Sequence, residues 1–201
     1  MALTAYDAPP PKSASARILM LRGINIGAHN RIAMPDLRAM LEADGISEVR
    51  TYVQSGNVVL RCERPPAELA QRAERLIAER FGLSIEVLAR TREELAAVVA
   101  RDPFADHQIA EKLYQVTFLA SEPPAELVTQ LADLAAGAER FVAIGREWYA
   151  YHADGIARSK LASRMAAKRR GVSMTARNWT TVRTLLAMAD ELSASRVAEE
   201  L

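Results

Sequence analysis

The glycines and polar side chains of residues 21–30, LRGINIGAHN, make this the stretch best suited to hold a ligand. Glycines permit close backbone approach, and successive N–H groups in such a loop can form an anion-binding nest. A helix predicted just beyond the loop adds partial positive charge, and arginines add forks of donors. We therefore expect Arg22, Asn25 and Gly27 to bind a ligand. The alternative is that the glycines only permit turns and the asparagines only satisfy local backbone groups.

The same loop matches no familiar phosphate-binding motif, but it is long. Its Gly-x-x-x-Gly spacing fits neither the Walker loop nor the dinucleotide fingerprint. A connection of about eleven residues between a strand and a helix exceeds the usual length, and such loops are usually functional or disordered. In the second half of the chain, the connection between the first predicted strand and its helix consists only of Ser121-Glu122. The loop thus indicates an elaboration of the first half without indicating a cofactor.

A second candidate is the Gln-Ser-Gly-Asn segment at residues 54–57, which separates two extended runs. These residue types are typical of a tight hairpin or a bulge, so a purely structural role explains them equally well. We expect this turn and the 21–30 loop to face a shared cleft. Gln54, Ser55 and Asn57 are therefore candidate ligand-binding residues.

The third candidate is the Arg177-Asn178 pair that precedes the last predicted helix. An arginine beside a helix N-terminus suits a phosphate or a carboxylate. Asn178 is also a good N-cap, so helix capping alone is the competing explanation.

Basic residues concentrate in residues 158–183, although the net charge of the whole chain is only +1. This segment holds eight basic residues and no acid, which favours an anionic partner at one end of the molecule. Nucleic acid is one such partner, since ferredoxin-like sheets bind RNA through exposed aromatics, and Tyr149 and Tyr151 would share one strand face. The eight residues are Arg158, Lys160, Arg164, Lys168, Arg169, Arg170, Arg177 and Arg183.

The predicted elements follow one order in both halves: strand, helix, strand, strand, helix, strand, helix. This order predicts an α+β fold of tandem ferredoxin-like βαββαβ units, each with an extra helix, packed together. The units would span residues 17–104 and 112–192, after a disordered tail at residues 1–16. One continuous α+β domain is the alternative. Strands are predicted at residues 17–22, 49–53, 58–61, 84–90, 113–120, 140–144, 148–151 and 172–176.

Composition narrows the class of protein. The single cysteine, Cys62, excludes an internal disulfide and fits a reducing compartment, so we expect a cytoplasmic location. His29, His107 and His152 lie far apart, and we expect no metal and no cofactor. No apolar run approaches the ~20 residues of a membrane span, and the N-terminus lacks signal-peptide features. No residue can be nominated as a catalytic base or nucleophile, and the oligomeric state stays open.

Three motifs together resemble the domain of unknown function 1697 family. They are LRGINIG with RIAMPDLRAMLEADG, then VRTYVQSGNVVL, then SKL with TARNWTTV, and the resemblance runs from about Arg17 to Leu192. It implies tandem ferredoxin-like α+β units in a soluble bacterial protein, and it implies no activity. It also implies that the three candidate stretches belong to one pattern. Ala28-His29 departs from that pattern, where members often have a further glycine.

Binding is the leading functional hypothesis. We expect a small anionic or phosphate-bearing ligand in a cleft lined by the 22–31 loop and the 54–57 turn. One alternative is a nucleic-acid-binding module that uses residues 158–183. Others are an enzyme acting on a phosphorylated metabolite and a scaffold or oligomerisation module without a ligand.

Overall fold

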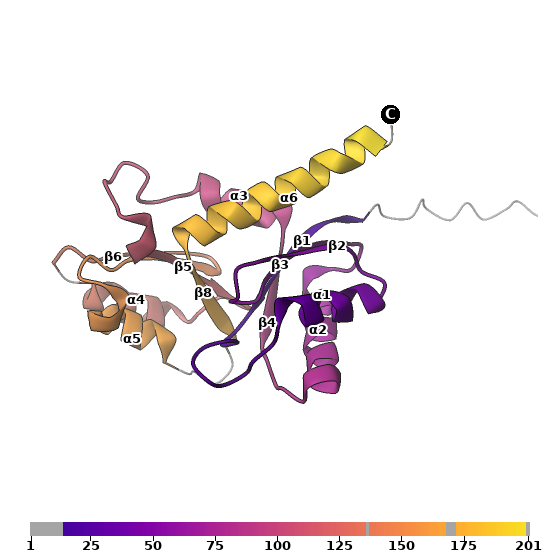
Figure 1. Cartoon of the computed structure of the whole chain (residues 1–201). Coiled ribbons are helices and arrows are strands. Elements are labelled where there is room, and N and C mark those ends of the chain that lie inside the picture. The colour runs from indigo at the N-terminus through magenta and orange to yellow at the C-terminus, as the bar shows by residue number, and fades with distance from the viewer. Residues whose placement is uncertain (1–13, 136, 168–171, 200–201) are drawn as a thin grey trace, which may run out of the picture.

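The computed structural model describes residues 14–135, 137–167 and 172–199. These residues form a mixed α+β fold with two four-stranded antiparallel sheets (Figure 1). The first sheet has the order β2-β3-β1-β4, with β1 at Ser15–Leu21, β2 at Ser47–Tyr52, β3 at Asn57–Cys62 and β4 at Val87–Thr91. The second has the order β6-β7-β5-β8, with β5 at Tyr114–Leu119, β6 at Arg140–Ile144, β7 at Glu147–Tyr151 and β8 at Met174–Asn178.

Six α-helices connect and cover these strands within the described residues. Thr91 and Glu94 form a capping box at the start of α3. Gly82 ends α2 in the left-handed conformation that glycine adopts without strain. The helices are α1 (Met34–Ala43), α2 (Pro66–Phe81), α3 (Arg92–Ala100), α4 (Ala125–Leu134), α5 (Lys160–Ala166) and α6 (Trp179–Glu199), with 3-10 turns η1 (Glu111–Leu113) and η2 (Ile156–Arg158).

Both halves use the same connectivity. Leaving the 3-10 turns aside, the order β-α-β-β-α-β-α describes β1 to α3 and again β5 to α6. The strand order within each sheet is also the same, so β1 corresponds to β5, β3 to β7 and β4 to β8. By the same correspondence, α6 is the counterpart of α3.

Three hydrophobic clusters explain how the layers pack. α1 and α2 cover the outer face of the first sheet, and α4 and α5 cover the outer face of the second. The inner faces of both sheets share one central cluster with α3 and α6, so the two halves are packed together. Figure 1 shows α6 running from β8 across to β1 and β3 of the first half. The central cluster includes Ile18, Met20, Leu95, Val116, Phe118 and Val182.

Several predicted boundaries differ from the structure. Residues 1–13 of the predicted tail lie outside the described residues, and β1 already begins at Ser15. β8 lies two residues later than predicted, because its ladder with β5 continues to Asn178. Periodicity predicts a helix after Gly155 with Ile156 buried. Instead a 3-10 turn comes first, Ile156 is exposed, and α5 begins only at Lys160.

Within the described residues, no helix is both long enough and apolar enough to cross a membrane.

Candidate functional site

Asn25 ties the 22–31 loop to the 54–57 turn. Its amide nitrogen donates to the carbonyl oxygens of Ile32 (2.9 Å) and Gln54 (2.7 Å), and its amide oxygen accepts from the Ile32 N–H (3.0 Å). The alternative in which the asparagine serves local backbone groups therefore describes Asn25 well. The first two candidate stretches nevertheless lie side by side, as expected.

The turn at Gly56 packs directly against the end of β1. A Cβ atom at Gly56 would lie 2.6 Å from Leu21 Cβ and 2.8 Å from Ile24 Cδ1, and Gly56 has a φ of +71°. Both the backbone conformation and the close contact require glycine here. The turn thus holds the first residues of the loop in place.

Arg177 joins the third stretch to the other two. The side chain is only 8% exposed, although it extends from β8 of the second half into the first half. All five N–H bonds of a guanidinium are used. Nε donates to Asn57 Oδ1, Nη1 to Thr175 Oγ1 (2.8 Å) and Ala176 O (2.8 Å), and Nη2 to Leu21 O (2.7 Å) and Ser55 O (3.2 Å).

None of these five acceptors carries a charge. Burial lowers the pKa of Arg177 to about 10, so the side chain stays protonated near pH 7. Burying an ion without a counter-charge is costly, and folded proteins normally pair such groups. No described carboxylate forms an ion pair with Arg177. Among the described residues, only dipoles therefore balance this buried positive charge.

A cavity of about 460 Å³ lies beside Arg177, between the 22–31 loop, β8, α5 and the start of α6. Four of the predicted site residues line it: Arg22, Ser55, Arg177 and Asn178. The other four, Asn25, Gly27, Gln54 and Asn57, do not. The remaining described lining residues are Gly23, Ile24, Ile26, Thr117, Met165, Ala166, Met174, Thr175, Ala176 and Thr181.

Among the predicted residues that miss the cavity, Asn57 has a clear role. It is fully buried, accepts from Arg177 and donates to Tyr52 O (3.3 Å) and Ser55 Oγ (2.9 Å). Asn57 thus orients the arginine instead of facing the cavity. Gly27 lies at the exposed tip of the loop, where its carbonyl accepts from Arg31.

Two threonines in the cavity wall are absent from the predicted set. Thr117 and Thr181 are both buried, and neither hydroxyl makes a hydrogen bond to a described residue. Thr181 follows the predicted N-cap Asn178 by three residues, and its N–H donates to Asn178 Oδ1 (2.8 Å). The N-cap spacing in the sequence is the feature from which Thr181 could be predicted. Nothing in the sequence distinguishes Thr117 from other strand residues.

The helix that borders the cavity is α6 and not α1, contrary to expectation. Residues of α1 are absent from the cavity wall, whereas Asn178 and Thr181 belong to the first turn region of α6. A helix N-terminus presents unpaired N–H groups and partial positive charge. The N–H of Asn178 also points away from β5, because the ladder bonds alternate from Ala120–Ser173 onward.

Arg22 contributes less positive charge than its position predicts. Its Nη1 lies 2.6 Å from Glu86 Oε2, and the arginine side chain is 26% exposed. Glu86 therefore balances part of its charge at the rim of the cavity. The unbalanced charge beside the cavity is mainly that of Arg177.

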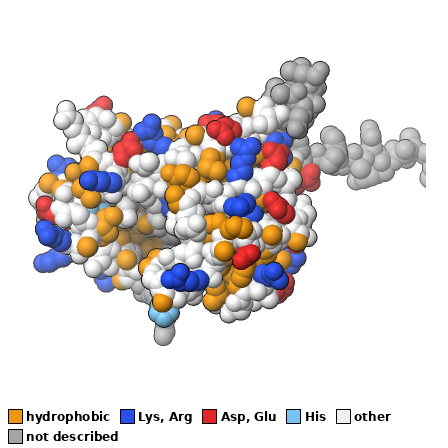
Figure 2. All heavy atoms as spheres, viewed as in Figure 1, with side chains coloured by type: hydrophobic (Ala, Val, Ile, Leu, Met, Phe, Trp, Pro, Cys, Tyr) orange, Lys and Arg blue, Asp and Glu red, His pale blue; other side chains and the backbone are white. Residues whose placement is uncertain are grey.

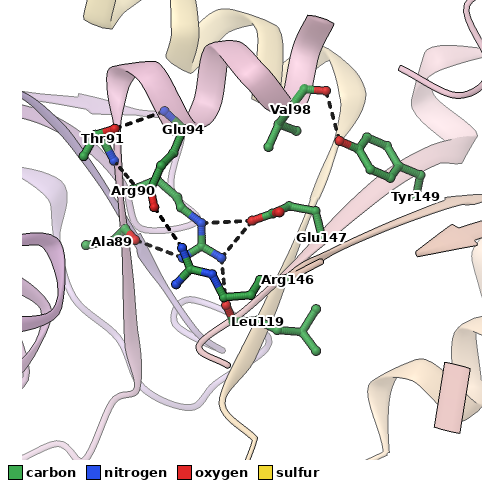
Figure 3. Close-up of polar contacts among 9 residues, drawn as sticks. All are labelled: Ala89, Arg90, Thr91, Glu94, Val98, Leu119, Arg146, Glu147 and Tyr149. Carbon is green, nitrogen blue, oxygen red and sulfur yellow. Dashed lines mark hydrogen bonds and ion pairs between the residues drawn. The ribbon is translucent and has the colours of Figure 1, made fainter. Parts of the chain in front are cut away.

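The other half contains a matching buried arginine, Arg90, which Figure 3 shows in detail. It is 2% exposed, and its Nε and Nη2 atoms lie 3.1 and 3.0 Å from Glu147 Oε1. Arg90 also donates to Ala89 O (3.0 Å) and Leu119 O (2.7 Å). Burial lowers the pKa of Arg90, and the Glu147 carboxylate opposes that shift. Here the fold supplies its own counter-ion.

The two arginines occupy corresponding positions. Each is the fourth residue of its strand, β4 or β8, and each donates to the carbonyl of the preceding alanine. Each also donates to the carbonyl of the last residue of the other half's first strand, β5 or β1. The third partner is the first residue of β7 or β3, which is Glu147 for Arg90 and Asn57 for Arg177. A carboxylate in one copy is thus an amide in the other.

The described basic residues of this segment do not form one surface. Arg177 is buried, and Arg183 pairs with Glu111 at 2.7 Å. Lys168, Arg169 and Arg170 lie outside the described residues. Figure 2 shows Lys and Arg side chains spread over the visible face with Asp and Glu among them. The charge asymmetry of the sequence is therefore only partly an asymmetry of the surface.

The aromatic face expected to be available for RNA is also closed. Tyr149 is buried in the central cluster, and its hydroxyl donates to Val98 O (3.0 Å), as Figure 3 shows. Tyr151 packs against the same cluster. The expectation of an open stacking surface on this strand is wrong, because this face of the strand packs with α3 and α6 in the central cluster.

Comparisons with known proteins agree on the fold and provide no activity. The conserved bacterial protein SP0830 from Streptococcus pneumoniae has a similar structure, with a TM-score of 0.66 and 19% identity, covering 88% of this chain and 99% of that chain. No curated protein matches the sequence. A family model described as a protein of unknown function (DUF1697) matches residues 15–149. The first two motifs lie within the matched residues, whereas the third lies beyond them, and the chain belongs to the DUF1697 family.

Proposed function

We propose that this protein binds a small anionic ligand in the cavity beside Arg177. The observation that supports this most strongly is a buried guanidinium with only neutral partners next to a cavity whose described wall contains no acid. An anion there would supply the charge that the fold omits, and a charge is worth more in a poorly hydrated site than in water. Thr117, Thr181 and Asn178 add donors that make no hydrogen bond to a described residue.

The cavity suits a ligand with a polar and an apolar part. Its volume of about 460 Å³ is within the usual range for small-molecule sites. Its wall contains both polar donors and apolar surface, the latter from Ile24, Met165 and Met174. A phosphate-bearing metabolite or a small organic acid would satisfy both parts.

Binding fits the described wall better than catalysis does. None of the described lining residues is Asp, Glu, His or Cys. The wall therefore offers no side chain suited to general-base catalysis near pH 7.

The test compares two arginines that each pair with an exposed glutamate. Arg22 lines the cavity and pairs with Glu86, whereas Arg50 pairs with Glu191 and does not line it. Calorimetric titrations would use inorganic phosphate, nucleoside monophosphates, sugar phosphates and small carboxylates. Arg22→Ala should weaken anion binding about five-fold, or ~1 kcal/mol, because a cation at the rim of the cavity is lost, and Glu86 already balances part of its charge. Arg50→Ala should bind as the wild type does.

Equal affinities for the two variants would contradict the proposed site. Absence of binding by every compound in the panel would contradict the proposed function itself.

We also infer that the two halves are tandem ferredoxin-like units, at residues 17–104 and 112–192. The shared element order and the shared strand order support this, since they are those of the βαββαβ motif. The extra helices α3 and α6 would then be the additions that join the units. The site would lie where the second unit's arginine enters the first.

A further inference from the structure

The correspondence between the two halves continues into the helices that follow the arginines. Thr91 caps α3 and accepts from the N–H of Glu94, three residues later (3.0 Å). Asn178 accepts from the N–H of Thr181 in the same way at the start of α6 (2.8 Å). Thr181 therefore occupies the position that Glu94 occupies in the other half.

The Glu94 carboxylate fills its own site. One oxygen accepts from the Thr91 N–H at 2.9 Å, and the other accepts from Arg146 Nη2 at 2.8 Å (Figure 3). In the other copy, the N–H of Asn178 corresponds to that of Thr91 and has no partner in the β5–β8 ladder. The side chain of Thr181 is too short to fill the place of that carboxylate, and Thr181 and Asn178 both line the cavity.

The charges of the two copies differ by one. Around Arg90, two cations meet two anions: Arg90, Arg146, Glu94 and Glu147. The corresponding residues around Arg177 include one cation and no anion: Arg177, Gly56, Thr181 and Asn57. Arg22 adds a cation at the rim, but Glu86 pairs with it. The residues around Arg177 therefore need one negative charge to become neutral, as the residues around Arg90 are.

We propose that the ligand of this cavity is a small monocarboxylate whose carboxylate takes the place that Glu94 occupies in the other half. This inference rests on the proposed anion-binding function and deepens it. The carboxylate accepts from the N–H of Asn178 and the hydroxyl of Thr181, two donors for two oxygens. Arg177 contributes charge but no hydrogen bond, since its five N–H bonds are occupied.

The remainder of the ligand is apolar. Beyond the donors, the described wall is formed by Ile24, Ile26, Met165, Ala166 and Met174. Methionine side chains adapt their shape to a ligand and contact aromatic rings favourably. An aryl or short branched acyl group would fill this part of the cavity, whereas a fully polar metabolite would leave it in contact with water.

The test uses acetate, benzoate and inorganic phosphate as probes, titrated into the full chain by calorimetry. Benzoate should bind at least ten-fold more tightly than acetate and more tightly than phosphate. Thr181→Val keeps the shape but removes the hydroxyl, and should weaken benzoate binding about ten-fold. Thr181→Ser keeps the hydroxyl and should restore most of the affinity. Thr184→Val is the matched control, because Thr184 lies one turn further along α6, outside the cavity wall, and bonds only to Thr180 O.

A second measurement uses only the wild-type protein, so it does not depend on whether a variant folds. In the amide NMR spectrum of the wild type, benzoate should shift the resonance of the Asn178 N–H more than any other β8 amide. A third uses Thr181→Glu, which installs the carboxylate of the other half. Benzoate should raise the melting temperature of the wild type and leave that of Thr181→Glu unchanged.

The possible outcomes separate this inference from the proposed function. Tighter binding of phosphate than of benzoate would overturn the carboxylate class. Anion binding that Thr181→Val does not weaken, or that leaves the Asn178 amide unshifted, would overturn the placement while the anion-binding function stands. If neither the three probes nor any compound of the phosphate-bearing panel binds, both the carboxylate inference and the proposed anion-binding function are overturned.

Discussion

Arg90 extends from the first half of the chain into the second, and Arg177 extends from the second into the first. The two arginines differ in whether a carboxylate balances their charge. Each guanidinium is buried, and each reaches the corresponding carbonyl of the opposite half. Glu147 balances Arg90, whereas Asn57 only orients Arg177. The shared geometry indicates that the arginine is part of how the fold closes. The missing counter-ion indicates where the molecule departs from its own structural pattern, and that is the place to look for function.

Removing the counter-ion of Arg90 should have the largest effect on the free energy of unfolding. Glu147→Gln leaves Arg90 buried without a charge partner, as Arg177 is. Loss of one partner of a buried pair typically costs about 3–5 kcal/mol of the free energy of unfolding. Urea denaturation of both proteins would measure the loss. Glu191→Gln breaks the exposed pair with Arg50 and should cost less than about 1 kcal/mol. A similar, small cost for both would contradict the claim that Glu147 balances the buried charge of Arg90.

The two hairpin turns that precede Asn57 and Glu147 should respond unequally to alanine. A Cβ atom at Gly56 would overlap Leu21 and Ile24, whereas one at Gly145 would contact nothing within 4 Å. Both glycines have positive φ. Gly145→Ala should therefore cost about 1 kcal/mol of stability for the backbone alone. Gly56→Ala should cost about 3 kcal/mol, because overpacking is added. Thermal unfolding of the pair measures the difference, and equal costs would show that the close packing of the 54–57 turn has no energetic weight.

Giving position 181 the glutamate found at position 94 should have a smaller effect on stability, in the opposite direction. Thr181→Glu places a carboxylate at the third position of α6, beside the N–H of Asn178 and near Arg177. A capping interaction and a favourable helix-dipole contact each contribute roughly 0.5–1 kcal/mol, so stability should rise by about 1 kcal/mol. Thr181→Gln controls for size without the charge and should give less than half of that gain. Denaturation at pH 7 would measure both, and destabilisation by the glutamate would contradict the correspondence of Thr181 with Glu94.

Local chemistry made much of the fold predictable. The capping box of α3 and the glycine that ends α2 could be located because such signals act within a few residues. The register of β8 could not, because it depends on pairing with β5, which is distant in the sequence. The break between η2 and α5 was missed for a related reason. Ser159 caps α5 through the N–H of Ala162, and serine is also common within loops.

The candidate site was predictable only in part. Polar residue types in unusual loops led to Arg22, Ser55, Arg177 and Asn178, which do line one cavity. Thr117 was missed because a lone threonine in a strand looks like any other strand residue. The relation of Arg177 to Arg90 was also beyond reach. It depends on the strand registers of both halves, and the two sequences around these arginines share only an Ala-Arg pair followed by an N-capping residue.

The most direct test of the central claim is a crystal structure of the protein soaked with 4-iodobenzoate, whose iodine can be located by anomalous scattering. We predict an iodine peak against Met165 and Met174, with the carboxylate within hydrogen-bond distance of the Asn178 N–H and the Thr181 hydroxyl. Iodine peaks only beside exposed cations such as Arg158 and Lys160, with the cavity next to Arg177 empty, would contradict it.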